Sequence, residues 1–155
     1  MQTAEDIVGK KKNDIISVTP QTTISEALRT MVDHKIGAVL IIEEGEIVGI
    51  WTERDLMRNM LQEGFDPQSA LIGDFMVREV KFAAHDDTVY DLMDKLLGLR
   101  LRHLPVEKEN KFIGLLSIGD VLRASLHEKS AELEKLHGIV SWAYYEEWRW
   151  DLETV

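Results

Sequence analysis

Two stretches of the chain end in the same pattern, and this repeat constrains the fold more than any other feature. The first runs from Gly49 to Asp55 and the second from Gly114 to Asp120, so they lie 65 positions apart. Each holds a glycine, two apolar residues, a hydroxyl residue, two variable residues and an aspartate. Self-similarity at a fixed spacing indicates one structural unit used more than once. We therefore expect a fold unit that occurs twice.

The repeat extends upstream into a helix in each unit. Apolar residues recur there at i, i+3, i+4, i+7 and i+8, which is typical of the buried stripe of an amphipathic helix. Thr23 and Glu26 have the spacing of a capping box, and Thr88 with Asp91 is a weaker version of it. The stripes are Ile24, Ala27, Leu28, Met31 and Val32 in the first unit and Val89, Leu92, Met93, Leu96 and Leu97 in the second.

A hairpin is predicted after each of these helices. Its first strand covers Ala38 to Ile42 in the first unit and Leu104 to Val106 in the second, and the turn signals are Glu44-Gly45 and Glu109-Asn110. This alignment gives the second unit two more residues before its hairpin and two fewer within it. A helix follows each terminal motif, and an extended segment such as residues 15–18 leads in. Each unit therefore reads helix, strand, strand, helix.

The length suits one compact domain made of two coupled units. A unit of about 60 residues buries too little surface to be stable alone, whereas two packed copies of it form a reasonable core. With 45% hydrophobic and 30% charged residues, the 155-residue chain has an ordinary globular composition. We expect a first unit at 3–61, a linker at 62–73 with a short helical piece around 67–71, a second unit at 74–127 and a helical tail at 128–155.

Composition argues against several classes of function. A formal charge of −10 disfavours nucleic acid as a partner. No apolar stretch approaches the roughly 18 residues of a membrane span, and the chain has no cysteine. The five histidines lack a metal-ligand spacing, and no catalytic constellation is present. We expect a cytoplasmic protein that is not an enzyme, without metal, nucleic acid or membrane partners.

The order, spacing and duplication of the motifs resemble a tandem pair of CBS domains, or Bateman module. The resemblance covers about residues 3–127 and includes the segments 14–20, 73–76 and 102–106 beside the two endings. It implies an α/β (α+β) fold in which two βαββα units pack sheet to sheet about a pseudo-twofold axis, followed here by the helical tail. It also implies a regulatory or energy-sensing protein that forms homodimers. The implied ligands are AMP, ADP or ATP, or S-adenosylmethionine or NAD, bound in two clefts.

The terminal motif itself has two readings. Thr52 can cap a helix with Asp55 in its first turn. A helix N-terminus with a hydroxyl can also bind phosphate, and an aspartate can accept hydrogen bonds from a ribose diol. The two roles are compatible, and the same holds for Ser117 and Asp120.

The resemblance extends each cleft to residues of the opposite unit, and for the Asp55 cleft it points to the whole segment 100–103 before the hairpin. Arg102 is the best phosphate ligand because its planar fork matches phosphate oxygens. Residues 34–38 stand where the second unit has 101–105, so the Asp120 cleft lacks that arginine and we favour the Asp55 cleft. The predicted residues are Thr52, Arg54, Asp55, Val80, Lys81, Arg102 and His103 for the Asp55 cleft, and Ile16, Val18, His34, Ile36, Ser117 and Asp120 for the other.

The tail holds three of the four tryptophans within residues 142–150. Such a cluster either docks on its own core or forms an interface with a second copy or an unidentified protein target. This leaves an alternative function, an adaptor whose clefts are empty and which works through its aromatic tail.

Overall fold

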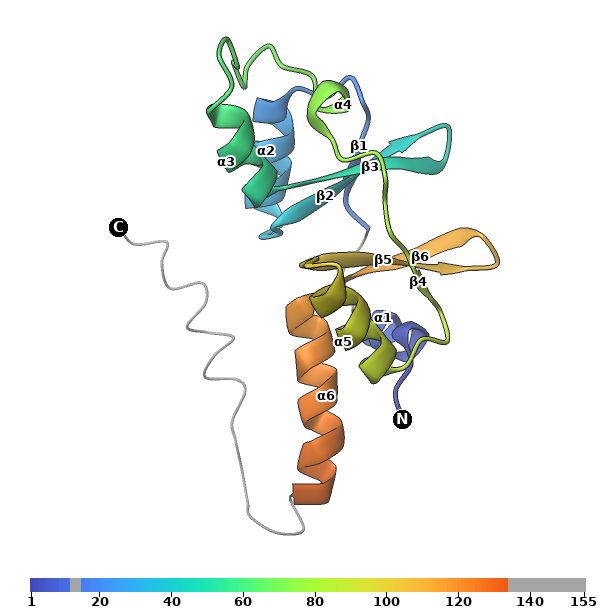
Figure 1. Ribbon diagram of the computed structural model, residues 1–155. Helices are drawn as coiled ribbons and strands as arrows, with labels where there is room; N and C mark the ends of the chain where they lie inside the picture. Colours follow the sequence, from blue (N-terminus) through green and yellow to red (C-terminus); the bar gives the residue numbers. More distant parts are fainter. Residues whose placement is uncertain (12–14, 134–155) are drawn as a thin grey trace.

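The computed structural model describes residues 1–11 and 15–133 and contains two three-stranded sheets that face each other (Figure 1). The aromatic cluster predicted for the tail lies outside the described residues. In each sheet the first strand pairs with the second in parallel, and the second pairs with the third antiparallel. The predicted α/β fold of two βαββα units is therefore confirmed.

The first unit comprises β1 (Ser17–Val18), α2 (Ile24–Asp33), β2 (Ala38–Glu43), β3 (Glu46–Thr52) and α3 (Glu53–Met60). The second comprises β4 (Ala83–Ala84), α5 (Val89–Gly98), β5 (His103–Lys108), β6 (Lys111–Ser117) and α6 (Ile118–Leu133). The predicted extension of the last helix is seen as far as Leu133, and the rest of that expectation lies beyond the described residues.

Both amphipathic helices begin at the predicted capping boxes. The Thr23 hydroxyl accepts a 3.2 Å hydrogen bond from the Glu26 N–H, and the Glu26 carboxylate accepts one of 2.9 Å from the Thr23 N–H. Thr88 and Asp91 make the same reciprocal pair. The hydrogen bonds from Thr23 hold the pKa of Glu26 below its ordinary value.

The two units follow the same register throughout, with a constant offset of 65 from β2 to α3 and from β5 to α6. The predicted two-residue shift around the hairpins is therefore wrong. In each unit the backbone leaves the first helix, α2 or α5, through one residue in the left-handed region. These residues are Lys35 (φ 54°) and Arg100 (φ 53°). The structural equivalent of Arg102 is consequently Gly37. Sequence matching misplaced the register because the polar His103 occupies the strand position of the apolar Ala38.

Both hairpins close through two residues with positive φ, as type I′ turns require. The angles are 52° and 81° at Glu44 and Gly45, and 51° and 61° at Glu109 and Asn110. The predicted turn signals are confirmed.

The helix that precedes each unit in the chain packs on the other unit. Helix α1 (Ala4–Lys10) lies within the range expected for the first unit, yet it packs on β6 and α6. Its start is tied down by the Ala4 N–H, which donates a 2.8 Å hydrogen bond to the Asp87 carbonyl. Helix α4 (Ile72–Phe75), in the connection between the units, packs instead on β3. The crossing segments couple the two units (Figure 1).

Each hydrophobic core includes residues from the helix that precedes the other unit. Ala4 and Ile7 join the buried cluster of the second unit, and Ile72 and Met76 join that of the first. The helical piece predicted around 67–71 is a single turn, and the assigned helix starts only at Ile72. Among the described residues, no helix is long and apolar enough to cross a membrane.

Candidate functional site

The two terminal motifs form the N-termini of α3 and α6. The Asp55 carboxylate accepts hydrogen bonds from the N–H (2.9 Å) and the hydroxyl (3.0 Å) of Thr52, both at Oδ2. The Thr52 hydroxyl accepts one of 3.3 Å from the Asp55 N–H. The capping interpretation is confirmed. It leaves Asp55 Oδ1 facing Arg58 Nη1 at 3.6 Å, so the carboxylate retains capacity to accept from a ligand.

A cavity of about 240 Å³ opens beside this motif, between the two units. The first unit supplies the end of β3 and the start of α3, and the second supplies the segment that enters β5. Its lining residues are Gly37, Ile50, Thr52, Glu53, Arg54, Asp55, Arg58, Val77, Arg100, Leu101, Arg102 and His103.

Positive charge dominates the lining of this cavity. Its four arginines outnumber its two carboxylates, Glu53 and Asp55, although the whole chain carries a net charge of −10. All four arginines are exposed, so that their guanidinium groups remain available to a bound anion. The Asp55 cleft is thus a local cationic site on an acidic protein.

Five of the seven residues predicted for this cleft line it: Thr52, Arg54, Asp55, Arg102 and His103. Val80 and Lys81 do not. The chain after α4 instead runs along β3, where Val77 and Ile50 exchange backbone hydrogen bonds of 2.8 and 3.0 Å, and this places Val77 at the cavity.

Two further arginines line the cleft. Arg58, which was not predicted, follows Asp55 by one helical turn, a spacing readable from the sequence. Arg100 begins the segment 100–103 to which the resemblance points, and it takes the left-handed residue position after α5.

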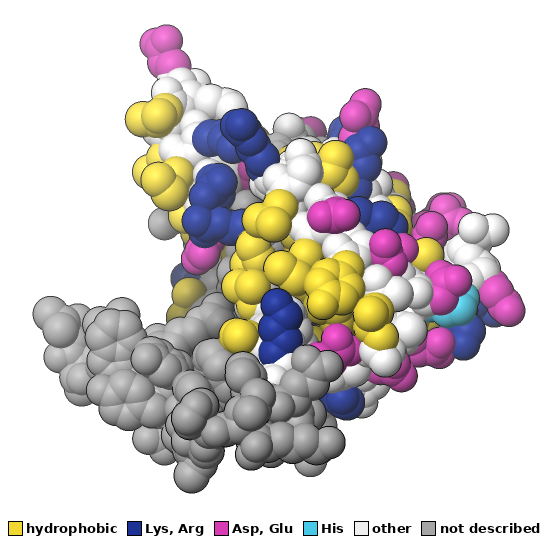
Figure 2. Space-filling model, turned by 60° about the horizontal axis from the view of Figure 1, so that its bottom comes forward, with side chains coloured by type: hydrophobic (Ala, Val, Ile, Leu, Met, Phe, Trp, Pro, Cys, Tyr) yellow, Lys and Arg dark blue, Asp and Glu magenta, His cyan; other side chains and the backbone are white. Residues whose placement is uncertain are grey.

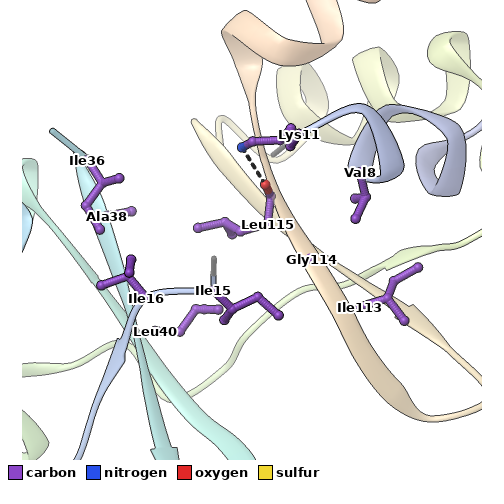
Figure 3. Close-up of a pocket in the computed structure, with 10 residues that line it drawn as sticks. All are labelled: Val8, Lys11, Ile15, Ile16, Ile36, Ala38, Leu40, Ile113, Gly114 and Leu115. Carbon is purple, nitrogen blue, oxygen red and sulfur yellow. Dashed lines mark hydrogen bonds between the residues drawn. The ribbon is translucent and has the colours of Figure 1, made fainter. Parts of the chain in front are cut away.

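A second cavity, of about 310 Å³, lies between the sheets (Figure 3). Its walls are largely apolar and come from both units. The predicted Ser117 and Asp120 do not line it, but Lys11, which does, is hydrogen-bonded to Asp120. Ile16 and Ile36 line it as predicted, whereas Val18 packs against the core of the first unit. His34 also lies away from this cavity, since it is exposed and its Nδ1 lies 2.8 Å from the Thr30 carbonyl oxygen.

Asp120 repeats the arrangement of Asp55 with one addition. Its Oδ2 accepts hydrogen bonds from the Ser117 N–H at 2.7 Å and from the Lys11 ammonium at 2.8 Å. Burial raises the pKa of Asp120, but the Lys11 and Ser117 hydrogen bonds and the Lys11 charge outweigh it and lower the pKa overall. Lys11 is not among the residues that the sequence predicts for this cleft, because helix α1 delivers it from far along the chain.

No group of three or more histidine, aspartate or glutamate side chains suited to a metal ion occurs in the parts of the chain described here.

The fold and its paired clefts define a tandem-repeat α/β protein with one cleft beside each repeated helix N-terminus. The CBS domain family model matches residues 4–62 and 72–127. The chain belongs to the CBS domain family.

Relatives agree with this assignment. A mitochondrial CBS domain-containing protein of Arabidopsis thaliana, CBSX3, is 35% identical over 81% of this chain, and the match spans 64% of that relative's length. The CBS-domain protein ATU1752 of Agrobacterium tumefaciens is 35% identical and superposes with a TM-score of 0.75, covering 80% of this chain and 99% of that one. CBSX2, solved in complex with AMP, is 25% identical, with a TM-score of 0.69 over 83% of this chain and 99% of that one.

Proposed function

We propose that this chain is a regulatory sensor that binds an adenine nucleotide of the AMP, ADP or ATP type in the Asp55 cleft. The observation that carries the proposal is one cavity that combines the Thr52 hydroxyl, the Asp55 carboxylate and four arginines. The AMP complex of the related CBSX2 supports this class of ligand.

Each part of a nucleotide finds a matching group in this cleft. The hydroxyl groups of the ribose donate hydrogen bonds to Asp55 Oδ1. The contact of this oxygen with Arg58, at 3.6 Å, is the interaction that competes with the ribose. The phosphates bind at the N-terminal end of α3 and to Arg102, because helix dipole and planar guanidinium both favour phosphate oxygens. The base lies among Ile50, Val77 and Leu101, which line the apolar part of the cavity.

Signalling follows from the shared construction of the site. Because both units supply lining residues, the affinity for the nucleotide depends on how the units pack. A ligand with different affinities for two arrangements shifts the population toward the one it prefers. We propose that this shift alters a homodimer contact or an unidentified protein target, and that the chain catalyses no reaction itself.

The Asp120 cleft is proposed as a second site. Ile16 and Ile36 offer apolar surface for a base, and Ser117 and Asp120, which lie outside the lining of this cavity, repeat the ribose and phosphate groups of the first motif. Lys11 is the one cation that lines its cavity within the described residues, compared with four arginines in the other cleft.

Calorimetry and thermal melting with AMP, ADP, ATP, NAD and S-adenosylmethionine test the proposal. A ligand at 100 times its dissociation constant should stabilise the protein by about 2.7 kcal/mol. Replacing Arg100 and Arg102 with glutamine should weaken the binding of phosphorylated ligands. The control Arg29→Gln, on the exposed side of α2, should leave their binding unchanged.

Two outcomes would count against this assignment. If no ligand stabilises the wild-type protein, the result favours an adaptor with empty clefts that works through its tail. If binding survives Asp55→Asn and Asp120→Asn in the same molecule, the ligand binds elsewhere and the assigned residues are wrong.

A further inference from the structure

The Lys11 ammonium is paired with the Asp120 carboxylate, the group that the proposed function assigns to a ribose. This ammonium donates a hydrogen bond to Asp120 Oδ2 at 2.8 Å. It donates a second one to the Leu115 carbonyl at 2.9 Å, which Figure 3 shows. The Asp120 side chain is 15% exposed and that of Lys11 is 32% exposed, so the pair is partly shielded from water. A charge-assisted hydrogen bond in such surroundings is stronger than one on an open surface.

The contact is held in place by the packing of helix α1. Lys11 is the C-terminal cap of α1, and its N–H donates to the Val8 carbonyl at 3.0 Å. Val8 in turn packs against Gly114 of β6, and the Ala4 N–H is bonded to the Asp87 carbonyl. Helix α1 is therefore attached near both of its ends to the unit that carries Asp120, and this attachment holds Lys11 in place.

The Asp55 cleft has no counterpart to this lysine among the residues described. Met76 lies against Gly49 as Val8 lies against Gly114, so the residue three positions beyond each contact is Glu79 in one unit and Lys11 in the other. Glutamate cannot donate a hydrogen bond to a carboxylate when both are ionised. Both aspartates face an arginine one helical turn on, Arg58 at 3.6 Å and Arg123 at 3.7 Å, but within the described residues only Asp120 also accepts a hydrogen bond from a lysine.

Lys11 also lines a third cavity, of about 550 Å³, together with Asp120. This cavity carries further basic groups, Lys10, Arg123 and His127, and Arg123 Nη2 lies 3.7 Å from Asp120 Oδ1. Lys11 therefore lies where a largely apolar cavity adjoins a basic one. Their chemistry suits the base and the phosphate of a nucleotide, respectively.

We propose that Lys11 is an internal competitor for the ribose position and makes the Asp120 cleft select phosphorylated nucleosides over neutral ones. This inference rests on the proposed nucleotide binding. Lys11 lines the apolar cavity whereas Asp120 does not, so a ribose that reaches Asp120 from this cavity must displace the ammonium. The ammonium must then find another anion or remain beside the apolar walls formed by Ile16, Ile36 and their neighbours. A phosphate group supplies that anion, whereas adenosine supplies none.

The test compares adenosine and AMP by calorimetry, with Asp55→Asn in every protein to silence the first cleft. Lys11→Met should raise the affinity for adenosine and lower that for AMP. The AMP-to-adenosine preference should fall about tenfold, the scale of one charge-assisted hydrogen bond. Lys11→Arg, which keeps the charge, should retain the preference, and the matched control Lys111→Met, on the exposed hairpin, should leave it unchanged.

An equal change in both affinities, or no change, would overturn the selectivity role while leaving nucleotide binding intact. Titration of the Asp120 carboxyl by NMR gives a readout without ligand, since its pKa should rise in Lys11→Met. A pKa that does not move would refute the competing contact. Failure of the proposed function is a separate result, in which the wild-type protein binds neither AMP nor adenosine, and the inference then falls with it.

Discussion

Val8 of helix α1 packs directly against Gly114 of strand β6, where any side chain on residue 114 would stand. A Cβ built on Gly114 lies 2.9 Å from Val8 Cγ2 and closer still to Cγ1. The contact joins the start of the chain to its second unit. It thereby fixes Lys11 beside Asp120.

Gly114→Ala should destabilise the protein by about 1–3 kcal/mol, because the added methyl group forces the stiff valine or the backbone to move. Urea unfolding measures this loss. The double variant Gly114→Ala with Val8→Ala should recover part of it. Gly9→Ala in the same helix, where a Cβ meets nothing within 4 Å, should leave stability unchanged or raise it slightly. Full stability of Gly114→Ala would contradict the close packing.

Trp51 is the largest fully buried side chain of residues 1–11 and 15–133, and its indole N–H donates a 2.9 Å hydrogen bond to the buried Asn59 side chain. Asn59→Leu leaves this donor without its acceptor in the core and should cost about 1–3 kcal/mol. The double variant Trp51→Phe with Asn59→Leu should cost less than the sum of the single changes, which a double-mutant cycle measures. Strict additivity would show that the hydrogen bond does not couple the two residues.

Asp120 should contribute pH-dependent stability. Its pKa is lower in the folded protein than its ordinary value, so its contribution is complete above the unfolded pKa of about 3.9 and is lost as the pH falls through the folded pKa. The stability difference between wild type and Asp120→Asn should therefore be largest near pH 7 and should shrink below about pH 5.

Urea unfolding at several pH values between 7 and 3 checks this expectation. Asp86→Asn, at an exposed turn, controls for the loss of one negative charge. A difference between wild type and Asp120→Asn that stays constant over the whole range would show that the Lys11 contact does not stabilise the carboxylate.

If the chain forms the proposed homodimer, we expect exposed apolar side chains of the second unit to lie in the dimer interface. Tyr90, Leu97, Leu122 and Leu126 of α5 and α6 are between 37% and 62% exposed, although α5 and α6 pack together. Figure 2 turns this end of the molecule forward and shows hydrophobic side chains gathered among charged ones. Contiguous apolar surface of this kind marks interaction sites.

Leu122→Glu with Leu126→Glu should reduce the molar mass in light scattering from dimer to monomer, because burial of charge at an interface is costly. The circular dichroism of the protomer should not change. Gln68→Glu, in the exposed connection between the units, should leave the mass unchanged. If only deletion of residues 138–155 yields a monomer, the aromatic tail and not these helices makes the contact.

The sequence by itself determined the repeated unit, the helices with their capping boxes, and the hairpins with their turns. These are local features, set by apolar periodicity and by residues that tolerate positive φ, as at Gly45 and Asn110. It also predicted five residues that line the Asp55 cavity, because the motif at Thr52 and Asp55 is contiguous and the segment around Arg102 is adjacent to a predicted strand.

Only the tertiary structure decided which unit is covered by α1 and which by α4, and how the two clefts differ. The attachment of α1 to the second unit depends on the fit of Val8 to Gly114, and no local pattern encodes a contact across so many residues. That attachment brings Lys11 to Asp120, 109 positions away. The displacement of Val80 and Lys81 by Val77 has the same origin, since a chain path along a strand edge is chosen by packing and backbone pairing and not by residue type.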